Sequence, residues 1–188
     1  MNFKTIGIPT LKLFIIGTVI TILLVVTNGR TAAQIVANQE KADVESRKEV
    51  LPEADDFEEK TAKLEDGTEF TYYEATNGAG FVFSASHKGY GGQVVTMTGI
   101  SKDGKIEGIK LTEQSETAGL GAKWAGNDTT GQEKRGQFVG DVPDEEFKVT
   151  KDGGTIEAVA GATITSRAVT SDVNDAVAMF KVVSGGAQ

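Results

Sequence analysis

The stretch that decides the fold is Gln93-Val-Val-Thr-Met-Thr-Gly-Ile-Ser-Lys-Asp-Gly-Lys-Ile-Glu-Gly-Ile-Lys-Leu111. Two runs with alternating apolar and polar residues, 93–100 and 105–111, flank Ser101-Lys-Asp-Gly104. An Asp-Gly pair between alternating runs is a strong indicator of a β-hairpin, because both residue types tolerate the left-handed backbone of a tight turn. The stretch therefore predicts two antiparallel strands.

Further strands and a final helix are predicted on both sides of this hairpin. Short runs rich in β-branched and aromatic residues, bounded by glycine turns, are typical of strands at 70–73, 81–84, 147–149 and 155–159. Near the C-terminus one apolar stripe has helical spacing: Val169, Val173, Ala176, Val177 and Phe180. We expect an α+β domain, a curved antiparallel sheet with packed helices, over residues 67–188.

The N-terminal residues 1–30 indicate a membrane anchor. Residues 13–27 carry no charge, and extended back to Ile6 the apolar segment reaches the roughly 20 residues that cross a bilayer. Lys12 lies near its end, where a lysine can extend to the headgroups. A cleaved signal peptide is the first alternative, although Arg30 stands where a small residue is expected. A pilin-like assembly helix is the second, although the first acidic residue is Glu40.

The charges on either side of this segment favour a cytoplasmic N-terminus. Lys4, Lys12 and the amino terminus precede the segment, and Arg30 follows it. The remainder of the chain has 16 basic against all 27 acidic side chains, a formal charge of −11, and would lie outside the cell. Residues 31–66 are predicted as a helical stalk, with a thin apolar face at 32–50, followed by an acidic linker after Pro52.

The composition excludes several kinds of site. The chain of 188 residues has no cysteine, which rules out disulfides, thiolate metal sites and cysteine nucleophiles. His87 is its single histidine, so a multi-histidine metal site is excluded, and no catalytic acid–base pair is visible. A net charge of −8 argues against nucleic-acid binding. Any redox chemistry therefore requires an organic cofactor.

A first candidate site is Glu157-Ala-Val-Ala-Gly-Ala-Thr-Ile-Thr-Ser-Arg-Ala168. Small residues around Gly161 allow a bulky group to approach the backbone, and the free amides of a following helix attract phosphate. Arg167 can add a charge-assisted contact. The alternative is an ordinary helix start, capped by Thr165 or Ser166.

A second candidate site is the glycine-punctuated loop Glu116-Thr-Ala-Gly-Leu-Gly-Ala-Lys-Trp124. Gly119 and Gly121 allow the backbone close to a flat ligand, and Leu120 and Trp124 offer apolar surfaces. The spacing fits neither a P-loop nor a dinucleotide-binding fingerprint. The alternative is a turn followed by a core tryptophan.

Together these motifs resemble the FMN-binding domain of the G subunit of the Rnf complex, to which the C subunit of the sodium-pumping NADH:quinone reductase is related. The resemblance rests on Gly161-Ala-Thr-Ile-Thr-Ser166, on Glu116-Thr-x-Gly-Leu-Gly121 upstream, on Gly89-Tyr-Gly-Gly92 and on the single anchor. Two positions depart from the family pattern: Glu157 stands in place of an aspartate and Ala160 in place of Ser/Thr.

The resemblance implies a covalent cofactor. In this family FMN is joined through its phosphate to the threonine after Gly-Ala, here Thr163, by a separate magnesium-dependent flavin transferase. Thr165 and Ser166 are expected to supply phosphate donors, while Glu116 hydrogen-bonds the ring system or caps the turn. The cofactor-binding residues expected are Tyr90, Glu116, Thr117, Gly119, Leu120, Gly121, Gly161, Ala162, Thr163, Thr165 and Ser166.

The resemblance also implies a function and partners. The chain would be an electron-carrying subunit of a membrane complex that links ferredoxin and NAD redox chemistry to sodium or proton movement. Its partners would be multi-spanning subunits, a second FMN-carrying subunit and iron–sulfur subunits. The alternatives are a stand-alone extracytoplasmic FMN carrier, the related C subunit of the quinone reductase, and a cofactor-free adhesion or assembly protein.

Overall fold

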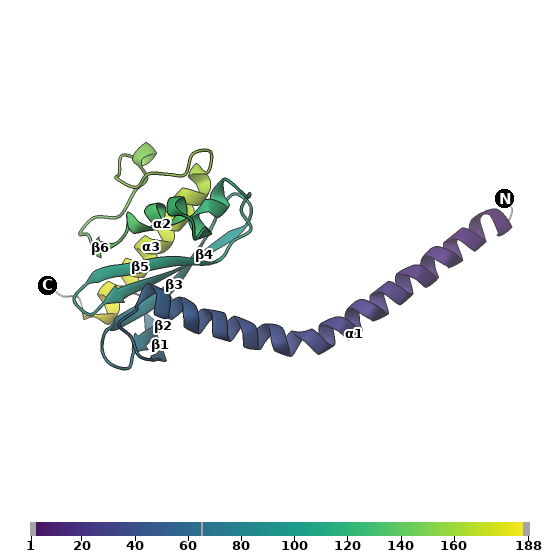
Figure 1. Cartoon of the computed structure of the whole chain (residues 1–188), viewed down its shortest axis with the longest axis horizontal. Coiled ribbons are helices and arrows are strands. Elements are labelled where there is room, and N and C mark those ends of the chain that lie inside the picture. The colour runs from purple at the N-terminus through teal and green to yellow at the C-terminus, as the bar shows by residue number, and fades with distance from the viewer. Residues whose placement is uncertain (1–2, 65, 186–188) are drawn as a thin grey trace. The chain divides into compact units, whose positions relative to one another are not determined.

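Figure 1 shows a computed structural model of the chain, which describes residues 3–64 and 66–185. The chain divides after Asp43 into two compact units. The first consists of the larger part of helix α1 (Phe3–Val50), and the second contains the end of that helix and the remaining elements.

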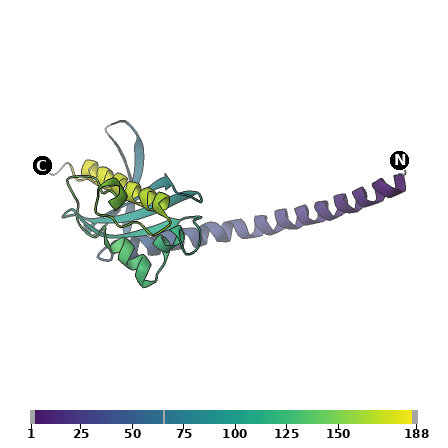
Figure 2. The ribbon, with the colours of Figure 1, turned by 90° about the horizontal axis from the view of Figure 1, so that it is seen from above.

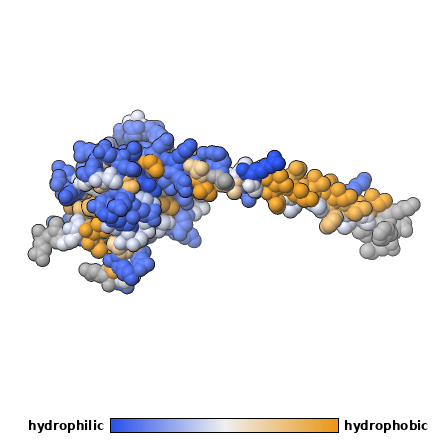
Figure 3. Space-filling view, turned by 90° about the horizontal axis from the view of Figure 1, so that it is seen from below, coloured by the Kyte–Doolittle hydropathy of each residue, from blue (hydrophilic) through white to orange (hydrophobic). Residues whose placement is uncertain are grey.

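The segment Gly7–Ala32 of α1 has the length and composition of a membrane span. Its large apolar side chains are exposed, Leu13 and Phe14 each to 70%, and hydrophobic residues cover this part of the helix in Figure 3. The hydroxyls of Thr18 and Thr21 donate to carbonyls four residues earlier, which satisfies them without water. Such a helix is stable in lipid, where apolar side chains need no protein partner.

The second unit is built on a six-stranded sheet in which every neighbouring pair is antiparallel. The strand order follows the chain: β1 (Phe57–Lys63), β2 (Glu69–Ala75), β3 (Gly80–Lys88), β4 (Gln93–Ser101), β5 (Lys105–Glu113) and β6 (Gly140–Asp141). The predicted hairpin is confirmed as β4 and β5. Two register shifts between these strands increase the local twist of the sheet.

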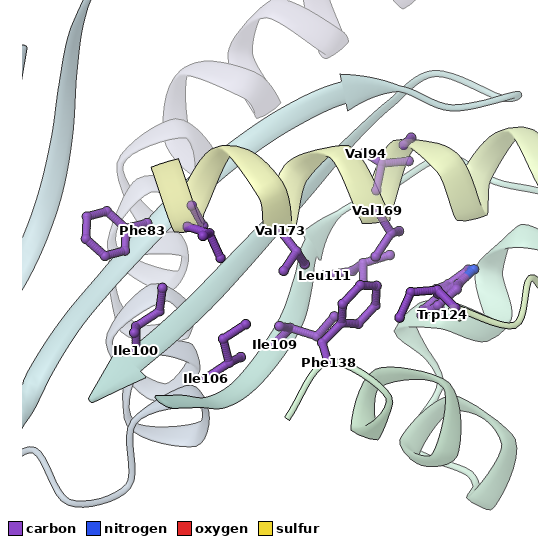
Figure 4. Close-up of a cluster of buried hydrophobic side chains, with 14 of the residues drawn as sticks. Phe83, Val94, Ile100, Ile106, Ile109, Leu111, Trp124, Phe138, Val169 and Val173 are labelled. Carbon is purple, nitrogen blue, oxygen red and sulfur yellow. The ribbon is translucent and has the colours of Figure 1, made fainter. Parts of the chain in front are cut away.

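Helix α3 (Thr163–Val183) packs across one face of the sheet against β3 and β4, as Figures 1 and 2 show. The 3₁₀ helix η1 (Gly121–Ala125) and helix α2 (Thr129–Gly136) pack against β5. Figure 4 shows the core enclosed between these elements, where Val169 and Val173 of α3 meet Trp124 and Phe138. The predicted α+β architecture is therefore confirmed.

The last turn of α1 packs on the opposite sheet face. Val50 and Leu51 join a second buried cluster with Val82 and Met97. A Cβ added at Gly99 would lie 2.2 Å from the carbonyl oxygen of Val50, so only glycine permits this approach. The contact connects the end of the stalk helix directly to the central strands.

The structure differs from the sequence prediction at three places. Residues 57–63, expected in an acidic linker, form edge strand β1, in which most of the charged side chains are exposed. The strands predicted at 147–149 and 155–159 reduce to one parallel bridge between Val149 and Ile156. Helix α3 begins at Thr163, earlier than expected, with Ala162 in the N-cap position.

Candidate functional site

Thr163 is the first residue of α3 and follows a tight corner. Gly161 has φ of +77°, a left-handed conformation that disfavours any side chain. The Ala162 amide donates to the Val159 carbonyl oxygen at 2.9 Å, which closes the corner. Ala162 has no side-chain oxygen, so the N-cap residue makes no side-chain hydrogen bond to the amides of the first helical turn. The helix therefore begins with uncapped donors at a half-buried threonine hydroxyl.

A short 3₁₀ helix, η2 (Thr150–Asp152), lies against this first turn. Lys151 Nζ donates to Thr163 Oγ1 at 3.0 Å. Arg167, one helical turn after Thr163, binds both carboxylate oxygens of Asp152, at 2.7 and 2.6 Å. This pairing with Arg167 lowers the pKa of Asp152 and raises the pKa of Arg167. Arg167 thus fastens η2 to α3, whereas the sequence suggested a direct role with a ligand.

Two pockets meet at the corner. The first has a volume of about 330 Å³ and is lined by Thr150, Lys151, Glu157, Ala158, Val159, Ala160, Gly161 and Thr163. The second, of about 390 Å³, is lined by Tyr90, Glu116, Thr117, Leu120, Gly121, Gly161, Ala162 and Thr165. Gly161 belongs to both. The two candidate stretches of the sequence, about forty residues apart, therefore come together.

Glu116 holds the second pocket together. Its Oε1 accepts from the Gly91 amide at 2.8 Å, and its Oε2 accepts from the Thr165 hydroxyl at 2.6 Å. A Cβ on Gly121 would lie 2.6 Å from Glu116 Oε2 and 2.7 Å from Thr165 Oγ1, so this position leaves no space for a side chain. One carboxylate therefore ties the turn after β3 to the first turn of α3.

Ser166 lies in the core rather than in either pocket. Its hydroxyl donates to the Ala162 carbonyl oxygen at 2.9 Å and accepts from Trp124 Nε1 at 3.0 Å and from the Val159 amide at 3.1 Å. All its hydrogen-bonding capacity is used inside the protein. Ser166 thus shapes the corner from within, and Trp124, fully buried, serves as its support.

Comparison with known proteins places these pockets in a family. The sequence model of the FMN-binding domain matches residues 89–178, which contain every residue lining either pocket. The chain is similar to the G subunit of the Na⁺-translocating ferredoxin:NAD⁺ oxidoreductase complex of Acetobacterium woodii, at 38% identity over 98% of this chain and 96% of that protein. The chain belongs to the G-subunit family of ion-translocating oxidoreductase complexes.

Two further members span most of the chain. The G subunit of the ion-translocating oxidoreductase complex of Methanosarcina acetivorans is 36% identical, over 87% of this chain and 88% of that protein. The G subunit of the proton-translocating ferredoxin:NAD⁺ oxidoreductase complex of Clostridium ljungdahlii is 32% identical, over 94% and 90%. The resemblance noted in the sequence is thereby confirmed, and the chain carries the FMN-binding domain of this family.

Within this member of the G-subunit family, most of the predicted site residues come together. Eight of the eleven line the second pocket; among these eight, Gly161 and Ala162 form the corner between the two pockets. Thr163 lines the first pocket. Gly119, with φ of +78°, shapes the loop but lines neither of the two pockets. Tyr90 is 74% exposed at the rim of the second pocket.

Lys151 is the residue that the sequence analysis missed. It lies twelve positions before Thr163, in a stretch predicted to be a turn between strands, and no local pattern distinguishes it from other exposed lysines. The one indicator in the sequence was the pair of opposite charges Asp152 and Arg167. It indicates the position of Lys151 only once the loop that contains Asp152 is known to lie against α3.

His87 lies outside both pockets. Its Nδ1 is 2.8 Å from Oδ1 of the buried Asp172, whose Oδ2 accepts from the Thr96 hydroxyl at 2.7 Å. Burial raises the pKa of Asp172 to about 7. This pair joins α3 to β3 and β4 and has a structural role in the FMN-binding domain.

Proposed function

We propose that this chain is the electron-transferring G subunit of a membrane-bound, ion-translocating ferredoxin:NAD oxidoreductase, and that it carries FMN joined through its phosphate to Thr163. The observation that carries the proposal is the placement of the Thr163 hydroxyl at the uncapped start of α3, beside two adjoining pockets. The proposal is further supported by relatives of similar length whose names describe the G subunit of such complexes.

The two pockets differ in chemistry in a way that matches the two ends of FMN. Leu120 and Tyr90 give the second pocket apolar and aromatic surface for the flat ring system, and its glycine backbone permits close approach. Lys151 and the free amides of α3 give the first pocket donors for a phosphate. When bound, FMN supplies the redox chemistry, and the protein holds and shields it.

The attachment step uses an activated flavin nucleotide such as FAD, in which FMN is joined to AMP by a phosphoanhydride. Thr163 Oγ1 forms a new bond to the FMN phosphorus, and the bond from that phosphorus to the AMP oxygen breaks. AMP leaves with the electron pair, and the hydroxyl proton is released. A separate flavin transferase would catalyse this step, and the chain gains the mass of FMN less one water.

Intact mass spectrometry tests the attachment. The full chain, coexpressed with a flavin transferase, should gain the mass of FMN less water and show a fluorescent band on a denaturing gel. Thr163→Ala should abolish both, whereas Thr163→Ser, which keeps a hydroxyl, should retain them. Added mass that persists in Thr163→Ala would move the attachment to another residue, and a wild-type chain without added mass would refute the covalent cofactor.

We place the N-terminus in the cytoplasm and the FMN-binding domain outside, on the strength of Lys4 and Lys12 before the span and the acidic charge after it. The absence of cysteine from the sequence makes this simple to test. In intact cells a membrane-impermeant maleimide should label an Asn127→Cys variant, which is exposed in the domain, and not an Asn2→Cys variant. The reverse pattern would invert the orientation.

The proposed partners are the other subunits of the complex: multi-spanning membrane subunits, a second FMN-carrying subunit and iron–sulfur subunits. Purification of the tagged chain from its native membrane in mild detergent should recover them in fixed ratio. A flavinylated chain recovered alone would instead favour a stand-alone FMN carrier.

A further inference from the structure

Two basic side chains near Thr163 and its pocket are paired with carboxylates. Lys134 pairs with Glu157 at 3.2 Å, and Arg167 pairs with Asp152. Lys151 forms no salt bridge within the part of the chain that the structure describes, and its ammonium donates to Thr163 Oγ1 instead. The pocket therefore presents, next to the hydroxyl, an ammonium that no salt bridge among the described residues engages.

The position of Lys151 is fixed by its loop. The Thr150 amide donates to the Ile156 carbonyl oxygen at 2.9 Å, and the Ile156 amide donates to the Lys148 carbonyl oxygen at 3.0 Å. The paired charges of Asp152 and Arg167 then fasten the loop to α3. The backbone of Lys151 is held on both sides, and only its side chain must be ordered to reach a phosphate.

We infer that Lys151 is a positioning residue for the flavin phosphate. This inference rests on the proposed attachment at Thr163. Before attachment, the ammonium orients the hydroxyl oxygen and attracts the anionic flavin nucleotide. After attachment, the same ammonium pairs with an unesterified phosphate oxygen, in a charge-assisted contact that keeps the phosphate at the start of α3.

An ammonium near the oxygen favours the attachment step electrostatically. A neutral threonine hydroxyl gains no negative charge until its proton leaves, whereas the phosphorus that it attacks carries anionic oxygens. A nearby ammonium reduces the repulsion between the entering oxygen and those oxygens, and it does so without taking part in bond formation. Lys151 is thus distinct from the transferase residues that move the proton and bind magnesium.

The test compares attachment rates for four full-length, detergent-solubilised chains: wild type, Lys151→Met, Lys151→Arg and Lys102→Met. Each is mixed with purified flavin transferase and FAD, and intact mass gives the initial rate. We expect Lys151→Met to be about tenfold slower, which is the loss of one charge-assisted hydrogen bond. Lys151→Arg should restore most of the rate. Lys102→Met, which removes one charge from an exposed hairpin turn, should match wild type.

Salt dependence separates a charge effect from a loop effect. The ratio of the wild-type rate to the Lys151→Met rate should shrink as salt is raised, because screening weakens the attraction between the exposed ammonium and the anionic flavin nucleotide. Buried Trp124 reports whether each variant is folded, by its fluorescence. If Lys151→Met is misfolded, Lys151→Arg decides: a folded arginine variant that is tenfold or more slower than wild type would overturn the inference.

The outcomes distinguish this inference from the proposed function. If the wild-type chain is modified at Thr163 and the Lys151→Met chain is modified at the same rate, the role of Lys151 is overturned and the covalent flavin stands. A wild-type chain that gains no mass would refute the attachment itself, and the role of Lys151 with it.

Discussion

Helix α3 is one continuous helix, but its first turn and its middle have different roles. In the middle, Val169, Val173 and Ala176 are fully buried against the sheet. At the N-terminal end, Thr163 in the first turn and Arg167 directly after it contact η2 through exposed or half-buried polar groups. The middle of α3 therefore stabilises the fold, and this packing positions the polar groups of the first turn. Changes in the two regions should have separable effects.

The largest expected effect is on stability, from a change in the middle of the helix. Val173→Ala removes two buried methyl groups from a fully enclosed position and should lower the free energy of unfolding by about 2–3 kcal/mol. Attachment of flavin to the folded fraction should be unchanged. Trp124 fluorescence during urea unfolding measures the first quantity and intact mass the second. Val182→Ala, at a partly exposed site, is the control and should change stability far less.

A change at the corner should have a smaller effect on stability and a larger one on the site. Gly161→Ala places a side chain at φ of +77°, with its Cβ 3.2 Å from Leu120 Cδ2. We expect a loss of about 1–2 kcal/mol from the left-handed backbone, and slower flavin attachment because both pockets share this residue. Gly136→Ala, in a helical position with open space around it, should not destabilise the chain. Equal attachment rates in the two variants would contradict the role given to the corner.

The same contrast explains what the sequence could predict. The helical spacing of apolar residues at 169–180 and the alternating runs around the Asp103-Gly104 turn are local, periodic patterns. Both predictions are confirmed. Strand β1 was missed because an edge strand keeps charged residues on its exposed side, where its composition matches that of a linker. Residues 147–149 and 155–159 have strand-like composition, but they bridge each other at one point only.

The candidate site shows the same limit. Gly161 and the Glu116 loop were singled out because glycines and small residues mark close backbone approach, whereas Thr163 was singled out by the resemblance to the family. Lys151 was missed because its contact with Thr163 depends on the course of the intervening loop. The roles of Glu116 and Ser166 were also underdetermined, since a hydroxyl or carboxylate can face a ligand or the protein with the same sequence around it. In the structure, the oxygens of both side chains bond within the protein.

A pH dependence is expected from the middle of the helix. The folded state keeps the Asp172 proton up to about pH 7, because burial raises its pKa, whereas an ordinary aspartate releases it near 3.8. The folded chain therefore binds more protons in this window, and the contribution of Asp172 to stability falls as pH rises from 3.8 to about 7. His87 on β3, Thr96 on β4 and Asp175 on α3 are the polar groups that face it.

Thermal unfolding followed by Trp124 fluorescence at several pH values measures this effect on the full chain in detergent. The unfolding temperature of wild type should fall by a few degrees between about pH 5 and pH 8, and Asp172→Asn should flatten that dependence. Asp144→Asn, on the exposed surface, is the matched control and should follow wild type. Parallel curves for Asp172→Asn and wild type would show that this carboxyl does not carry the pH dependence.

The smallest effect is expected from the ion pair that fastens η2 to the first turn. Arg167→Gln releases Asp152 from its partner, and the freed carboxylate then competes with Thr163 for the neighbouring Lys151. Both consequences slow flavin attachment, by about threefold, because an exposed pair contributes little by itself. The buried middle of α3 is untouched, so the unfolding temperature should stay at the wild-type value.

Lys181→Gln removes the same charge from the last turn of the same helix and is the matched control for Arg167→Gln. It should attach flavin at the wild-type rate. If Arg167→Gln lowers the unfolding temperature as much as Val173→Ala does, then the first turn also stabilises the fold, and the division of α3 into two regions fails. If it instead slows attachment more than Lys151→Met, then Arg167 contacts the phosphate directly, as the sequence suggested, and Lys151 is the lesser of the two cations.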